Sequence, residues 1–187
     1  EYILEMTSTL MIETIEVFDP KENIKAYKLD VNSAYYFPIV DGKIEYHNEM
    51  TTAFHGIRWF YYNDEKELKW VEIFEENVRI YGCPILNFKQ MILVFDGESK
   101  ILPKPNNLGI FDIQGNLIKK IEIPQLISGL TYTKNNSPYF AKIGMTWNKI
   151  LVQINFGNTS YERRFYDPIT NTFGELFDSS EEGYYVR

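Results

Sequence analysis

The chain has 187 residues, which is long enough for one domain to bury a sizeable core. Apolar residues make up 44% of the chain and charged residues 24%, a balance that excludes global disorder. The formal charge of −7 argues against binding to nucleic acid and against docking on anionic lipid, because both need an electropositive surface. We therefore expect a single domain over residues 1–187 whose protein partner, if it has one, is basic.

Aromatic residues account for 16% of the chain, with 14 Tyr and 13 Phe. Such residues fit the half-buried surface of a pleated sheet, and this composition favours strands. Tyrosine also suits a binding surface, because it offers a large contact area with few rotamers to immobilise. The composition therefore predicts a β protein and leaves open a role for tyrosines in recognition.

The single cysteine, Cys83, cannot form an intramolecular disulfide, which is compatible with a cytoplasmic location and does not exclude an exported form. It lies among apolar residues, where a thiol is usually an inert small hydrophobe. No apolar run approaches the roughly 18 residues of a membrane helix, so we expect no membrane insertion.

Strand signals recur through the chain as short apolar or alternating runs bounded by Gly, Asp, Asn or Pro. The runs are residues 10–18, 35–40, 43–47, 57–62, 90–95, 108–112, 117–123, 129–133, 149–156 and 162–166. Asp41-Gly42 and Gly115-Asn116 are turn signals between neighbouring runs. The sequence therefore predicts an all-β fold of mainly antiparallel hairpins, as a sandwich, a barrel or a small propeller-like sheet, with at most one or two short helices.

Residues 64–78 are compatible with two structures. Leu68, Val71, Phe74 and Val78 fall roughly on one face of a helix, and Asp64 followed by Glu67 resembles a capping box. The same stretch forms a hairpin if a turn occupies residues 63–66 and a strand runs over residues 68–74, where Trp, Val, Ile and Phe prefer strands. We favour the hairpin. A second, weaker helix candidate covers residues 1–11.

An aromatic residue followed closely by Asp, a polar turn and an apolar residue recurs as Phe18-Asp19, Tyr62-Asn63-Asp64, Phe111-Asp112 and Tyr166-Asp167. This pattern is typical of a hairpin tip, where the Asp side chain accepts hydrogen bonds from turn amides. The spacing of the pattern resembles the blade repeat of β-propellers such as the kelch type. The resemblance covers only these hairpins, and the blade signatures are missing. We therefore favour an ordinary meander of hairpins as the explanation of the pattern.

Residues 97–109 contain two prolines and two asparagines and read as a long loop between strands, and residues 184–186 could form a last strand that holds the acidic tail. The two N-x-[ST] sequons, at Asn135 and Asn158, are interpreted as surface turns.

Motifs for catalysis and metal binding are missing. The sequence has no paired cysteines, no H-E-x-x-H, no calcium loop, no G-x-S-x-G and no glycine-rich phosphate loop, so we expect no metal and no cofactor. The sharpest catalytic hypothesis is the pair His47 and His55, with Glu45 and Glu49 nearby, as general acid and base of a phosphodiesterase. Two histidines in exposed loops are the simpler interpretation.

Acidic residues gather in three places and form our candidate partner-binding residues, because carboxylates beside aromatic rings suit a basic protein surface. A plain solvated face is the alternative. The three clusters are Asp64, Glu65 and Glu67; Glu72, Glu75 and Glu76; and Asp178, Glu181 and Glu182 with the neighbouring Tyr184 and Tyr185.

The sequence as a whole favours a non-catalytic protein-binding module. A concrete form of this class is a bacterial immunity protein that neutralises a basic, nuclease-like toxin by masking its surface, and the Asn-, Lys- and Ile-rich composition would suit an AT-rich bacterial genome. The alternatives are a small hydrolase that uses His47 and His55, and a β-rich segment of a larger surface protein.

Overall fold

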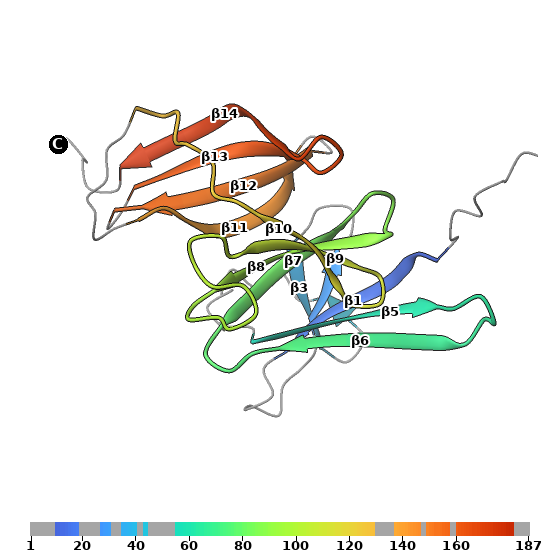
Figure 1. Ribbon diagram of the computed structural model, residues 1–187. Coiled ribbons are helices and arrows are strands. Elements are labelled where there is room, and N and C mark those ends of the chain that lie inside the picture. Colours follow the sequence, from blue (N-terminus) through green and yellow to red (C-terminus); the bar gives the residue numbers. More distant parts are fainter. Residues whose placement is uncertain are drawn as a thin grey trace, which may run out of the picture.

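The computed structural model describes residues 10–18, 27–30, 35–40, 43–44, 55–129, 137–146, 149–157 and 160–181. Within these ranges the fold is all-β, in three antiparallel sheets (Figure 1), as the sequence predicts. In the described part of the chain, no helix has the length and apolar character needed to cross a membrane.

The first sheet has the strand order β4-β3-β2-β1-β5-β6. Its strands are β1 (Ile12–Phe18), β2 (Tyr27–Asp30), β3 (Tyr35–Val40), β4 (Lys43–Ile44), β5 (Gly56–Tyr62) and β6 (Leu68–Phe74). The β5–β6 hairpin confirms the favoured interpretation of this region, and no helix forms over residues 64–78. Its strand-preferring residues alternate between core and solvent, a period of two that a helix could not satisfy.

The second and third sheets are four-stranded meanders in chain order. The second contains β7 (Arg79–Ile85), β8 (Gln90–Asp96), β9 (Leu108–Asp112) and β10 (Leu117–Ile121), and the third contains β11 (Tyr139–Thr146), β12 (Lys149–Phe156), β13 (Ser160–Asp167) and β14 (Thr172–Glu181). In each sheet sequential strands are hydrogen-bonded neighbours, so every connection within a sheet is local. In Figure 1 the second sheet lies between the other two.

Three described hairpin tips follow the predicted pattern, with one difference. Asp112 Oδ1 accepts hydrogen bonds from the backbone amides of Gln114 and Asn116. Asp167 Oδ1 does the same for Ile169. At the β5–β6 tip, however, the capping side chain is Asn63, whose Oδ1 accepts the Glu67 amide at 2.9 Å, and not Asp64. Asn63 directly follows the last residue of β5, whereas Asp112 and Asp167 are the last residues of β9 and β13.

One buried apolar cluster runs through all three sheets, from Ile12 to Tyr166. Trp59 on β5 is fully buried, and its indole N–H donates to the Ile113 carbonyl of the β9–β10 turn at 2.7 Å, which ties the first sheet to the second. Asn107 ties the second sheet to the third, since its amide donates to the carbonyls of Phe95 and Phe140 and its oxygen accepts the Phe140 amide. Buried polar groups with partners on both sides fix how the sheets pack.

Residues 97–107 form the predicted connection between β8 and β9, but part of it is buried. Leu102 and Ser99 are 1% and 5% exposed, and the Ser99 hydroxyl accepts the amides of Ile101 and Leu102. The loop therefore contributes to the core as well as to the surface.

The extended segment after β10 is held by a buried ion pair. The Glu162 carboxylate on β13 accepts the backbone amides of Ile127 and Ser128, while Arg164 donates to the Gln125 carbonyl. Arg164 Nη1 lies 3.8 Å from Glu162 Oε1. A buried ion pair contributes most to stability when its other polar atoms are also hydrogen-bonded. Here those atoms bond to the segment after β10.

Candidate functional site

The β5–β6 hairpin has one core face and one outer face. Ile57, Trp59 and Tyr61 alternate into the core, so Arg58, Phe60 and Tyr62 lie on the opposite side of the sheet. The register pairs Phe60 with Trp70 and Tyr62 with Leu68 across the two strands. We call the residues on this side the outer hairpin face: Arg58, Phe60, Tyr62, Leu68, Trp70, Glu72 and Phe74.

The outer hairpin face exposes large apolar side chains. Trp70 is 58% exposed, Leu68 53%, Tyr62 49% and Phe74 41%. β6 has no strand partner on its other side among the described residues, since it is the last strand of its sheet. Isolated apolar residues on a surface are common, but a contiguous aromatic group on a sheet face is a sign of an interaction surface.

Charges cross the same face in one row. Glu16 on β1 pairs with Arg58 in register, and Arg58 pairs with Glu72 on β6. Arg58 Nε lies 3.2 Å from Glu16 Oε2. The row holds two carboxylates and one guanidinium. Its exposed carboxylate, Glu72, lies on β6 between the apolar residues Trp70 and Phe74.

The first predicted acidic cluster lies at the tip of this hairpin. Asp64, Glu65 and Glu67 are all exposed. The carboxylate of Glu67 accepts from Asn63 Nδ2 and lies 2.9 Å from the Lys69 ammonium, and these contacts, Lys69 first, lower the pKa of Glu67. The structure therefore places this cluster at one end of the outer hairpin face.

The second cluster is divided by the fold. Glu72 belongs to the outer hairpin face, whereas the carboxylate of Glu75 accepts hydrogen bonds from the Ser99 hydroxyl, at 2.6 Å, and from the Lys100 amide. Glu75 thus fastens the residue 97–107 loop to the end of β6. Glu76 is exposed beside it.

The third cluster is far from the hairpin in sequence and is partly engaged within the third sheet. Asp178 on β14 forms a two-pronged ion pair with the Arg163 guanidinium of β13, and this contact raises the pKa of Arg163. Glu181 pairs with Ser160 in the backbone register. Glu182, Tyr184 and Tyr185 lie outside the described residues, as do the predicted turn at 41–42 and the last strand at 184–186.

The histidine pair cannot be assembled from the described residues, because His47 lies outside them. His55 is half-buried at the start of β5, where its Nδ1 lies 2.8 Å from the Val78 carbonyl oxygen. Since a carbonyl only accepts, Nδ1 carries the proton in this contact. His55 therefore connects β5 to the start of the second sheet, a structural contact that involves one of its two ring nitrogens.

Cys83 is 1% exposed, and burial raises the pKa of its thiol to about 12. At neutral pH the group stays protonated and is a poor nucleophile, in line with the sequence analysis. Among the described residues, no group of three His, Cys, Asp or Glu side chains is placed to hold a metal ion.

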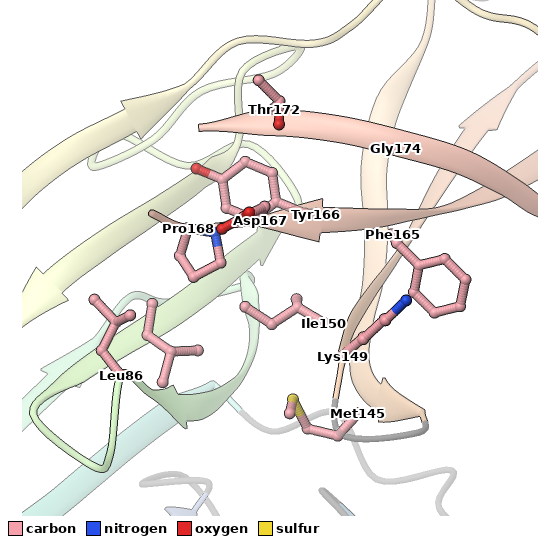
Figure 2. A pocket seen from close by; sticks show the side chains of 11 residues that line it. Leu86, Met145, Lys149, Ile150, Phe165, Tyr166, Asp167, Pro168, Thr172 and Gly174 are labelled. Carbon is pink, nitrogen blue, oxygen red and sulfur yellow. The ribbon is translucent and has the colours of Figure 1, made fainter. Parts of the chain in front are cut away.

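A pocket of about 490 Å³ lies between the third sheet and the β7–β8 turn (Figure 2). Its floor is buried and formed by Ile85, Ile150 and Tyr166. In Figure 2, Leu86 lies on one side, Phe165 and Lys149 lie on the other, and Ile150 lies between them. No local sequence motif marks this pocket, because its residues come from the β7–β8 turn and from β7, β11, β12, β13 and β14.

Comparisons with protein-family models, with curated protein sequences and with solved structures found no match to this chain.

Proposed function

We propose that this chain is a non-catalytic protein-binding module that docks on a basic protein through the outer hairpin face. The observation that supports this most is the exposed group of Tyr62, Leu68, Trp70 and Phe74 with Glu72 among them. Trp and Tyr are the residues most often found at the energetic centre of interfaces, because they bury much area and lose little side-chain entropy.

The charge of the face and of the chain selects the partner. Glu72 lies between Trp70 and Phe74, the hairpin tip carries Asp64, Glu65 and Glu67, and the chain has a formal charge of −7. Complementary charge accelerates encounter and disfavours acidic partners, while the aromatic residues supply most of the affinity. A bacterial immunity protein that masks a basic toxin is the specific form of this proposal, and a cytoplasmic location would suit it.

Charge reversal at the face tests the basic partner. The proteins encoded beside this chain are the first candidates, and Kd is measured by calorimetry for the native chain and for Glu72→Lys. Because Glu72 is exposed, the substitution should leave the fold intact and weaken binding at least about tenfold, since like charges then meet.

Glu122→Lys is the matched control, because Glu122 is an exposed carboxylate away from the face. It should leave Kd unchanged. Equal affinity of both variants, or no binding to any protein from the genomic neighbourhood, would count against the proposal.

The alternative of a β-rich segment of a larger surface protein has one supporting observation. The second and third sheets are consecutive four-stranded meanders in which β11 packs against β7 and β8, a modular arrangement that further sheets could extend. A native gene that continues well beyond the present ends with similar four-strand units would favour it.

A further inference from the structure

We propose that β6 binds an extended, basic segment of the partner as an additional strand of the first sheet. This inference rests on the proposed function, and it specifies which kind of segment binds and how it binds. Strand addition to an open sheet edge combines main-chain hydrogen bonds, which supply affinity, with side-chain contacts at alternate residues, which supply specificity. The backbone, the regularity and the charge of β6 all support this mode of binding.

The backbone of β6 has a row of polar groups that face away from β5. Beyond one end of the strand Asn63 N donates to Glu67 O at 3.0 Å, and beyond the other end Glu75 N donates to His55 O at 3.2 Å. Hydrogen-bonded pairs alternate along an antiparallel ladder, and the register here is unbroken, so the odd-numbered residues of β6 direct their N–H and C=O groups to β5. The even-numbered residues direct theirs away from it. We call these four the edge residues: Leu68, Trp70, Glu72 and Phe74.

The edge residues are open to a further strand within the described ranges. β6 is the last strand of its sheet, and it runs along the outer side of β5 (Figure 1). None of the described turn and loop hydrogen bonds reaches the backbone of the edge residues. Their side chains are exposed as well, because all four belong to the outer hairpin face. An incoming strand therefore meets main-chain donors and acceptors together with exposed side chains.

β6 also differs from the other edge strands of the three described sheets, each of which has a feature that opposes further pairing. β4 has only two residues, and β7 contains Pro84. β10, β11 and β14 each have a shifted register with the neighbouring strand, which marks a bulge or an irregularity. β6 has seven residues in unbroken register and no proline, and its single lysine, Lys69, is paired with Glu67. It is long and regular enough to accept another strand.

The charge around β6 favours a basic segment. Residues 64–74 contain four carboxylates and two lysines, a net charge of −2. In the incoming strand, the residue opposite Glu72 lies beside an exposed carboxylate, so Lys or Arg is favoured there and Asp or Glu is disfavoured. The residues opposite Trp70 and Phe74 lie beside exposed apolar side chains. The segment that fits therefore has a basic residue with an apolar residue two positions away on either side.

The probe is the capped peptide acetyl-Val-Thr-Lys-Thr-Val-Thr-Val-amide, which has as many residues as β6 and places Lys opposite Glu72 in an antiparallel pairing. Its binding to the full chain is measured by NMR titration and by amide hydrogen exchange. We expect the amides of the edge residues to shift and to exchange more slowly when the peptide is bound. A peptide with Glu in place of Lys should bind at least about fivefold more weakly, because like charges then lie side by side.

A second peptide isolates the main-chain bonds. It has the same side chains and is N-methylated at Lys and at the three Val, so it cannot donate from the residues that face the edge residues. We expect it to bind at least about tenfold more weakly than the parent peptide, since several hydrogen bonds are lost together.

A pair of variants makes the same comparison in the chain. Leu68→Pro removes an outward N–H at the first residue of β6, a strand position that tolerates proline, whereas Leu68→Ala removes the side chain and keeps the N–H. We expect Leu68→Pro to bind the parent peptide at least about fivefold more weakly than Leu68→Ala. The N-methylated peptide requires no variant, so its result stands even if Leu68→Pro unfolds the chain.

The inference is overturned if the N-methylated peptide binds as tightly as the parent peptide, or if neither binds at millimolar concentration. It is also overturned if the free chain is a dimer whose edge residues exchange slowly before peptide is added, because a second copy then occupies β6. None of these results decides the proposed function, which is tested separately by Glu72→Lys against the proteins encoded beside this chain. A partner that binds there through side chains alone would leave the proposed function intact.

Discussion

At the scale of single residues, Asn107 is a buried polar link between two sheets. It is fully buried and bonds to Phe95 and Phe140 on two different sheets. Asn107→Ala should lower the free energy of unfolding by about 2–4 kcal/mol, because it leaves two carbonyls and one amide buried without partners. Urea unfolding measures the loss.

Asn116→Ala is the control for this prediction, because Asn116 is exposed in a turn and bonds only to Asp112. It should cost less than about 1 kcal/mol. Equal losses in the two variants would show that the bonds of Asn107 do not hold the sheets together.

For two glycines in strands, substitution by Ala should have opposite effects on stability. A Cβ at Gly82 would clash with the Leu93 side chain and with the Ile92 carbonyl oxygen, whereas a Cβ at Gly144 would meet no atom within 4 Å. Gly82→Ala should therefore destabilise the fold by about 1–3 kcal/mol, and Gly144→Ala should be neutral or stabilise it by about 0.5 kcal/mol. Thermal unfolding of both variants distinguishes the effects, and a stable Gly82→Ala variant would contradict this packing of β7 on β8.

Two buried groups predict a loss of stability in alkali. Burial raises the pKa of Tyr166 to about 12, and it raises the pKa of Cys83 to about 12 from an ordinary value near 9. Since both folded-state pKa values lie above the unfolded ones, the stabilisation is complete below pH 9 and is lost as the pH rises toward 12.

The measurement is the free energy of unfolding between pH 8 and pH 12. Tyr166→Phe and Cys83→Ala should each flatten the decline, because the variant lacks the group that titrates. A decline of the same steepness in both variants would show that other groups cause it.

At the scale of elements, the β5–β6 hairpin places two tryptophans on opposite faces. Trp59 is fully buried and donates to the Ile113 carbonyl, whereas Trp70 is 58% exposed. Trp59→Phe should cost about 2–3 kcal/mol through the lost bond and a cavity, and Trp70→Phe should change stability by less than about 0.5 kcal/mol. Urea unfolding tests both, and a large loss for Trp70→Phe would mean that the outer hairpin face is covered.

Some strands could be predicted from the sequence and others could not, for reasons that lie in their composition. β5, β8, β9, β10, β12 and β13 coincide with runs of apolar or alternating residues between turn signals, and such runs predict strands. β7 contains Gly82 and Pro84, which normally interrupt strands. The proline is tolerated because β7 is an edge strand of its sheet. β14 is mostly polar and exposed and has irregular register with β13, so its sequence lacks the alternation of a half-buried strand.

The residues of the candidate surface were only partly predictable. The acidic clusters are visible in the sequence, but the fates of Glu75 and Asp178 depend on Ser99 and Arg163, which are 24 and 15 residues away. Trp70 and Phe74 read as ordinary strand residues, and only the register with β5 shows that they share an exposed face. Which face of a strand is covered depends on packing between sheets, and that is not a local property of the sequence.

At the scale of the whole molecule, three sheets share one buried cluster while the outer side of the first sheet keeps its aromatic residues in solvent. Exposure of Trp70 and its neighbours gives the free chain an unfavourable apolar surface, and a bound partner would remove that surface from water. Because the chain is acidic and salt screens charge attraction, the association rate with a basic partner should fall as salt is added.

The measurement that tests the outer hairpin face most directly is the affinity of the Trp70→Ser chain for the proposed basic partner. Ile118→Ser is the comparison, since it removes an exposed apolar residue of β10 outside the face. We predict that Trp70→Ser raises Kd at least about thirtyfold, as expected for a central interface residue, and that Ile118→Ser leaves Kd unchanged. An unchanged Kd for Trp70→Ser in a folded chain would contradict the account.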